Sequence, residues 1–179
     1  ALAPWGRGDL DAGHRTFSRA LSLMRRTGHE RDAMRGIFVL GDLRVAQGRL
    51  REAAHTYEDG LREARTGTHA APPETDELYL GLAEVHREWN DLAGATALLD
   101  ECARMADRSA HAGTRLRWCA AMASIRASAG DPGAALSLLA EGERHERRDP
   151  VPRARPIAAM RARLHLAQGR VRDAATWAE

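Results

Sequence analysis

The chain has 179 residues and a formal net charge of +2, and all 27 of its basic side chains are arginines. Domains average about 150 residues, so we expect one domain over residues 1–179. The missing lysine excludes a P-loop, whose lysine reaches the nucleotide phosphates, and the nearly balanced charge is not typical of a nucleic-acid surface. No apolar run is as long as a membrane span and no signal-peptide pattern is present, so we expect a cytoplasmic globular domain.

A turn signal recurs along the whole chain. Its start positions are spaced by 40, 42, 40 and 39 residues, at Gly8, Gly48, Asn90, Gly130 and Gly169. Five residues after each start the side chain is small, at Gly13, Ala53, Ala95, Ala135 and Ala174. Nine residues after each start the side chain is apolar, at Phe17, Tyr57, Leu99, Leu139 and Ala178. Because self-similarity at a fixed period is typical of stacked repeat units, the sequence predicts a repeat protein.

Apolar residues on either side of each turn have the spacing of one helix face. The stripe before the third turn has intervals of 4, 3 and 4 residues: Leu78, Leu82, Val85 and Trp89. This period predicts helices. In chain order we expect them at about 9–26, 30–47, 50–65, 74–89, 91–106, 111–129, 132–146 and 153–168, with another beginning at 171. Connectors are expected at Thr66–Pro73 and Asp149–Pro156, where prolines would interrupt a helix.

The turns carry residue types that end one helix and begin the next. Glycine and asparagine readily adopt the left-handed conformation that follows a helix. We therefore assign a structural role to five turn residues: Gly48, Asn90, Asp91, Gly130 and Gly169. Asp9, Asp91 and Asp131 are expected to cap the following helix, and Pro132 suits its first position. The small residue after each turn is expected to let paired helices approach to roughly 8–10 Å.

These patterns predict an all-α fold, a right-handed solenoid of antiparallel helix hairpins. The chain would hold about four and a half hairpins in a single helical-repeat domain. The last helix reaches only from Val171 to Glu179, and Ala1–Gly6 is a stub where the first helix of the first pair is expected. Because a solenoid needs end caps with a polar outer face, we expect the 179 residues to be a fragment of a longer chain.

Three segments resemble the repeat region of large ATP-binding LuxR-type (MalT-like) transcription regulators. They are Gly81–Ala95, with its Glu-Trp-Asn-Asp-Leu turn, Leu43–Ala53, and Leu164–Trp177, with its closing Ala-Ala-Thr-Trp. A tetratricopeptide repeat has 34 residues, so the interval found here places the chain among relatives with longer helices. The resemblance implies a nucleotide-binding module before this region, with the P-loop that these residues lack, and a DNA-binding helix-turn-helix after it.

A column of basic residues four positions before each turn is the candidate ligand-binding feature. It consists of Arg44, His86, Arg126 and His165, and Tyr79 lies about two helical turns before His86. Seven positions before each turn the residue is always small: Gly41, Ala83, Ala123 and Ala162. If this face lines a groove, its donors would suit an anionic or hydroxylated ligand, or an acidic helix. The alternative is that the small residues pack against the next unit while the arginines extend into water.

The other aromatic and basic features are expected to be structural. Trp89 and Trp118 share the apolar stripe, so core packing is favoured over ligand stacking. Trp5 and Trp177 are expected to pack against neighbours beyond this sequence. The basic run 144–155 lacks interleaved aromatic residues and contains prolines, so a solvated loop is favoured over a phosphate-binding surface.

No motif of a catalytic or metal site is strong enough to predict an enzyme. The clusters His29-Glu30-x-Asp32 and His145-Glu146-x-x-Asp149 fall at expected helix ends in charged stretches, so we expect neither to hold a metal ion. Cys102 and Cys119 lie on successive helices and are expected to be small packing residues. We predict no cofactor and no enzymatic activity.

Two classes of function remain. In the first, a small-molecule effector or protein partner binds the solenoid and controls the nucleotide-binding and DNA-binding modules of the same regulator. In the second, the domain is an interaction scaffold or self-association module without a small ligand. Neither class requires a membrane or direct nucleic-acid contact by this segment.

Overall fold

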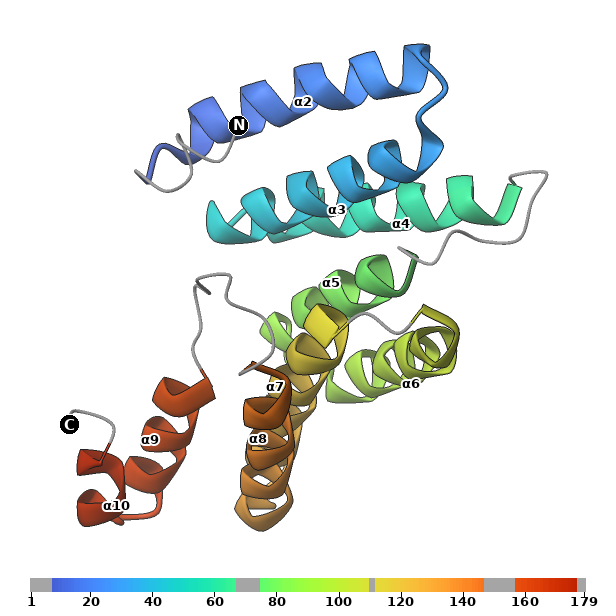
Figure 1. Cartoon of the computed structure of the whole chain (residues 1–179). Coiled ribbons are helices and arrows are strands. Elements are labelled where there is room, and N and C mark those ends of the chain that lie inside the picture. The colour runs from blue at the N-terminus through green and yellow to red at the C-terminus, as the bar shows by residue number, and fades with distance from the viewer. Residues whose placement is uncertain (1–7, 67–74, 110–111, 147–156, 177–179) are drawn as a thin grey trace. The chain divides into compact units, whose positions relative to one another are not determined.

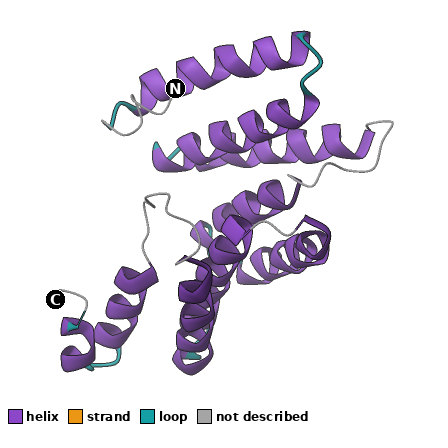
Figure 2. Ribbon diagram, in the orientation of Figure 1, coloured by secondary structure: helices purple, strands orange, loops and turns teal. Residues whose placement is uncertain are grey.

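We describe residues 8–66, 75–109, 112–146 and 157–176 from a computed structural model of the chain. Every regular element in these ranges is an α-helix, and none of these residues is in a strand (Figures 1 and 2). The helices are α2 (Leu10–Arg26), α3 (Glu30–Ala46), α4 (Leu50–Thr66), α5 (Thr75–Glu88), α6 (Leu92–Ser109), α7 (Ala112–Ser128), α8 (Pro132–Glu146), α9 (Ile157–Ala167) and α10 (Val171–Ala175). The expected all-α fold of helix hairpins is confirmed.

The observed helices match the expected ones closely, apart from single residues at several ends. The cap residues Asp9 and Asp91 precede the helices in which we had included them. Helix α6 is longer than expected because it continues from residue 106 to Ser109. The expected start of α9 at 153–156 and nearly all of the two predicted connectors lie outside the described residues.

The turns that join the helices share one hydrogen-bonding scheme. The first turn residue has a positive φ of 74° at Gly48, 61° at Asn90, 80° at Gly130 and 72° at Gly169. The next backbone N–H reaches back to the carbonyl five residues earlier at 2.8–2.9 Å, as Arg49 does to Arg44 and Asp91 does to His86. This is the Schellman motif, in which a left-handed residue satisfies carbonyls at the helix end.

The predicted aspartate caps are confirmed. The Oδ1 atoms of Asp9, Asp91 and Asp131 each accept a hydrogen bond of 2.9 Å from the backbone N–H three residues later. Each carboxylate thereby satisfies a donor that the first helical turn leaves open. At the turns with arginine in this place, the side chain instead pairs with an acidic residue three positions on, as Arg49 does with Glu52 at 2.7 Å.

The chain divides into two compact units, Ala1–Ser109 and Ala110–Glu179. In the first unit, helices that follow one another in sequence, from α2 to α6, pack together, and α3 also contacts α5. Its core contains Tyr57, which is fully buried and whose hydroxyl donates a 2.7 Å hydrogen bond to Asp42 Oδ1. Gly41 and Gly81 flank this ring so closely that a Cβ on either would lie 2.3–2.4 Å from it. The phenol therefore occupies space that both glycines leave open.

In the second unit, α7 pairs with α8, α8 packs on α9, and α9 pairs with α10. The core cluster consists of Leu116, Ala123, Ala135, Leu139 and Ile157. Leu139 occupies the repeat position of Tyr57, and the half-buried Met160 packs against the same cluster. Among the described residues, no helix is long and apolar enough to cross a membrane.

Candidate functional site

The predicted basic column occupies one defined place in the repeat. Arg44, His86, Arg126 and His165 are the residues whose carbonyls accept the long Schellman hydrogen bond of each turn. Their side chains therefore leave the helix within its last turn. Arg44, His86 and Tyr79 belong to the first unit, and Arg126 and His165 belong to the second.

The Arg44 side chain reaches from α3 to α4. Its Nη1 donates to the carbonyl oxygen of Glu52 at 3.3 Å and to the hydroxyl of Thr56, and its Nε lies 3.7 Å from Glu52 Oε2. The guanidinium is half-buried and ties the two helices of one hairpin together. These contacts give Arg44 a structural role whether or not it also meets a ligand.

His86 is engaged within its own turn. Its Nδ1 lies 2.7 Å from Asp91 Oδ2, and its ring centre lies 5.6 Å from that of Trp89. The pKa of Asp91 is lowered, first by the backbone hydrogen bond from Gly94 and then by the hydrogen bond with His86. The carboxylate thus caps α6 through one oxygen and holds the imidazole of α5 through the other.

The other predicted ligand-binding residues have different surroundings. Tyr79 is nearly buried, and its hydroxyl accepts a 3.2 Å hydrogen bond from Arg65, which raises the pKa of that guanidinium. Arg126 is exposed, and its side chain makes no polar contact with another described residue. His165 is buried, and its Nδ1 has no hydrogen-bond partner within the described parts of the chain. The five residues belong to two units that are described separately, and their ligand-binding role stays a prediction.

The small residues seven positions before the turns lie inside the units. Gly41 packs against the Tyr57 ring, and its equivalents Ala83, Ala123 and Ala162 are buried. Helix packing therefore occupies the space that an open groove would need along this column. This arrangement favours the packing interpretation of the small residues.

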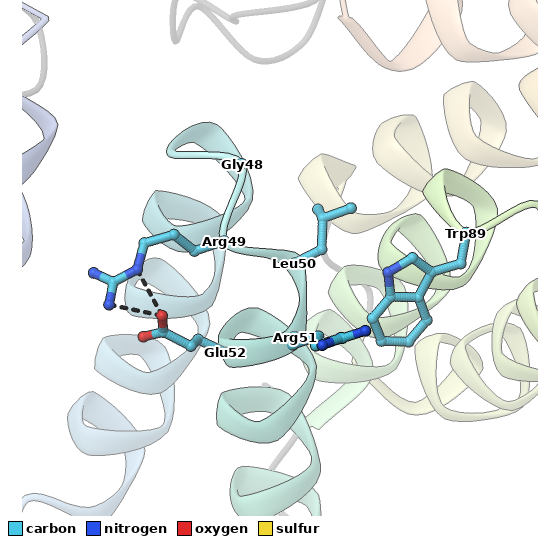
Figure 3. Close-up of a pocket in the computed structure, with 6 residues that line it drawn as sticks. All are labelled: Gly48, Arg49, Leu50, Arg51, Glu52 and Trp89. Atoms are coloured by element: carbon cyan, nitrogen blue, oxygen red, sulfur yellow. Dashed lines mark hydrogen bonds and ion pairs between the residues drawn. The ribbon is translucent and has the colours of Figure 1, made fainter.

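Two shallow hollows lie along the turns of the first unit. The first has a volume of about 350 Å³ and is lined by Gly48, Arg49, Leu50, Arg51, Glu52 and Trp89. Figure 3 shows the Arg51 side chain directed toward the Trp89 indole, whereas Arg49 and Glu52 pair on the other side of the turn. The second, of about 420 Å³, is lined by Gly8, Asp9, Leu10, Asp11, Gln47 and Arg49. None of the five predicted ligand-binding residues lines either hollow.

The expectation that Trp89 packs in the core is wrong, because 44% of its surface is exposed. It follows the last residue of α5 and directly precedes the left-handed Asn90, so its side chain leaves the helix at the turn. Trp118 is half-buried, with the Arg115 guanidinium 4.5 Å from its ring centre. In the sequence, only the place of Trp89 directly before the turn residue Asn90 signalled this outcome.

The described residues contain no group of three or more His, Cys, Asp or Glu side chains that could hold a metal ion. Asp149 of the second cluster considered, and most of the basic run 144–155, lie outside these residues. Neither Cys102 nor Cys119 forms a disulfide; both are buried, and they lie in different units. Burial raises the pKa of the Cys119 thiol to about 11, which keeps it protonated and poorly nucleophilic.

Comparison with known proteins agrees with this architecture. The crystal structure of BtubC (BKLC) from P. vanneervenii is similar with a TM-score of 0.69 at 19% identity, over 94% of this chain and 70% of that one. The crystal structure of MamA is similar with a TM-score of 0.52 at 12% identity, over 98% and 88%. These likenesses show the fold alone, and no curated protein matches the sequence. The family described as the MalT-like TPR region matches residues 2–179, so the chain belongs to that family of tetratricopeptide-like helical repeats.

Proposed function

We propose that this chain is the regulatory helical-repeat region of a LuxR-type transcription regulator in the cytoplasm. The observation that carries the proposal is the family match over residues 2–179, which includes every repeat of the chain. In such a regulator, nucleotide-binding and DNA-binding modules flank the repeat region. The role proposed for the repeats is binding and not catalysis, because stacked helical repeats provide extended binding surfaces.

The input we propose is contact with a protein or peptide segment. Small-molecule sites are usually concave and bury most of their ligand. The hollows at Trp89 and at Gln47 are shallow. Arg44 and His86 already bind groups of their own hairpins. The small residues seven positions before the turns are packed inside the units. An exposed indole beside arginine, as at Trp89 and Arg51, suits a macromolecular surface better than an enclosed metabolite.

The partner would act by shifting a conformational equilibrium. Binding changes the regulator only by the difference between the partner's affinities for its two states. The hairpins would transmit that preference to the flanking modules through the arrangement of successive repeats. The DNA contact itself would belong to the helix-turn-helix.

Two measurements test this proposal. Deleting the gene that encodes the chain is expected to change a defined group of transcripts, and complementation should restore them; an unchanged set of transcripts would contradict a regulatory function. A thermal-shift screen of the 179-residue chain against small metabolites is expected to leave Tm unchanged. A saturable rise in Tm with one metabolite would show instead that the input is a small molecule, because a ligand specific for the folded state stabilises it.

A further inference from the structure

Trp89 is the one exposed aromatic side chain among the described residues. It directly precedes the third turn, and the residue in this place is glutamine or alanine at the second, fourth and fifth turns: Gln47, Ala129 and Gln168. The repeat therefore does not require a large apolar side chain at this position. Because single exposed apolar residues are common on protein surfaces, the surroundings of Trp89 decide whether it has a function.

The hollow that Trp89 lines has a counterpart one repeat earlier. Each hollow is formed by the first residues of one turn and the residue that precedes the next turn, which is Trp89 in one and Gln47 in the other. In the earlier hollow Gln47 Nε2 donates a 2.7 Å hydrogen bond across to Asp11 Oδ1. In the hollow at Trp89 the place of Asp11 is taken by Arg51, whose side chain points toward the indole (Figure 3).

The side chains of Arg51 and Trp89 can only donate hydrogen bonds, because neither a guanidinium nor an indole N–H has an acceptor. They therefore cannot bind each other as Gln47 and Asp11 do. Neither side chain has an acceptor among the described residues. A carboxylate would satisfy such donors, and hydrogen bonds between a guanidinium and a carboxylate are among the stronger ones in proteins.

The acidic side chains beside the hollow are already paired. Glu52 pairs with Arg49 at 2.7 Å, and Glu88 pairs with Arg87. Arg51 is exposed, and no acidic side chain in the described parts of the chain pairs with it. The hollow therefore has a positive charge that is not compensated, next to the apolar surface of the indole. Charge complementarity favours a partner with a negative charge in the matching place.

The indole is held in position from within its own turn. The centre of the His86 ring lies 5.6 Å from that of Trp89, and His86 Nδ1 lies 2.7 Å from Asp91 Oδ2. The other oxygen of Asp91 accepts the hydrogen bond of 2.9 Å from the Gly94 N–H that caps α6. A side chain that is positioned before binding loses less conformational entropy when a partner docks.

We propose that the hollow at Trp89 is a docking site for a short acidic segment of a partner protein. An apolar side chain of the segment packs on the indole, and a neighbouring carboxylate pairs with Arg51. Tryptophan and arginine are the residue types that most often dominate the binding energy of protein interfaces. The proposal rests on the proposed function and names the surface and the chemistry through which the regulator receives its partner.

A random peptide library displayed on phage is the probe, because it presents short segments of many charges and shapes. The immobilised 179-residue chain selects from the library, and the enriched peptides are synthesised with a fluorescent label. Fluorescence polarisation then measures their binding to the wild type and to variants. The central variant is Trp89→Gln, because the repeat itself has glutamine in this place at Gln47 and Gln168. An unchanged Tm shows that the variant is folded.

We expect the enriched peptides to carry aspartate or glutamate beside an aromatic or aliphatic residue. Trp89→Gln should weaken the tightest of them by about tenfold or more, because it removes the apolar anchor. Arg51→Glu should weaken it about threefold or more at low salt and less at high salt, since salt screens exposed charges. The matched controls, Leu23→Gln and Arg19→Glu, change exposed side chains that do not line the hollow and should leave binding unchanged.

Four results would overturn the proposal. The first two are no enrichment of acidic peptides with an apolar residue, and equal binding of the enriched peptides to the wild type and to Trp89→Gln. The third is displacement of the peptide by inorganic phosphate or free glutamate as effectively as by unlabelled peptide, which would identify a site for small anions. The fourth is a concentration-dependent dimer that Trp89→Gln dissociates, which would identify a second copy as the occupant.

The transcript measurement keeps the two proposals apart. If gene deletion alters transcripts but Trp89→Gln does not, the docking surface is wrong and the regulatory function stands. If deletion alters none, the regulatory function itself fails.

Discussion

Tyr57 in the first unit and Leu139 in the second occupy the same place in the repeat, nine residues after a turn start, and both are essentially fully buried. Tyr57 fits because Gly41 and Gly81 leave room for its ring. At the equivalent places around Leu139 lie Ala123 and the partly buried Met160. A large residue between two glycines in one unit is thus replaced by a smaller residue beside larger neighbours in the other.

This difference shows that the repeat preserves filled volume and not residue type. Close packing requires that a gain of side-chain volume at one position be offset at another. The polar groups are matched as well, because the phenol of Tyr57 meets Asp42, whereas the same position in the second unit is Ser124. Exchanging residues between the two places should therefore be costly unless their neighbours change with them.

The largest expected effect comes from placing tyrosine in the second unit. Leu139→Tyr should lower the free energy of unfolding by about 2–6 kcal/mol, because it overpacks the cluster and buries a hydroxyl without its carboxylate. Urea denaturation followed by circular dichroism measures the loss. Unchanged stability would show that the second unit holds room for the larger ring and that the packing difference is not real.

An intermediate effect is expected at the glycines of the first unit. Gly41→Ala should destabilise the chain by about 1–2 kcal/mol net, because the new methyl meets the Tyr57 ring and only part of that cost is offset by the better helix propensity of alanine. In a Tyr57→Leu background the same change should become neutral or stabilising. The control is Gly133→Ala, where the nearest atom to a new Cβ is 3.7 Å away. Additive effects of the changes at Gly41 and Tyr57 would refute the coupling.

The turns of the two units should differ less. Asp131→Ala removes the cap of α8 and should cost about 1 kcal/mol, a typical value for such caps. Arg49→Ala removes only an exposed ion pair at the turn before α4, so its cost should stay below about 0.5 kcal/mol. Thermal unfolding of both variants measures the difference. An equal loss of stability in the two variants would mean that the capping hydrogen bond of Asp131 stabilises the chain no more than the exposed ion pair of Arg49 does.

The smallest effect is the pH dependence of the turn before α6. The lowered pKa of Asp91 means that its ionised form is favoured in the folded chain. Its stabilising contribution is therefore complete above the ordinary carboxyl pKa of 3.8 and is lost as the pH falls below it. Comparing wild type with Asp91→Asn by urea denaturation at pH 6 and pH 3 should show a larger acid-induced loss for the wild type. Parallel losses would contradict this role.

Much of the fold was predictable because the determining interactions are local. Glycine or asparagine at each turn start can adopt a positive φ, and an aspartate directly after it can cap the next helix. These preferences depend on a few neighbouring residues, so helix ends near Gly48, Asn90 and Gly130 follow from residue type. The period of the apolar stripe then predicts which face of each helix is buried.

The candidate sites were less predictable because they depend on contacts between helices. Position 89 belongs to the apolar stripe by spacing, yet the left-handed turn directs its indole to the surface beside Arg51. Arg44 belongs to a column of possible ligand donors by spacing, yet Glu52 and Thr56 of the next helix bind it. Spacing along one helix carries no information about which groups a neighbouring helix supplies.

By itself, the sequence determined the helices, their turns and the repeat period, because backbone conformation and amphipathic periodicity are read within a few residues. Only the tertiary structure decided that Gly41 and Gly81 make room for Tyr57 and that Trp89 is exposed. Each of these outcomes depends on the volume and position of atoms from another helix. Close packing makes such contacts specific, and that specificity exists only once the helices are assembled.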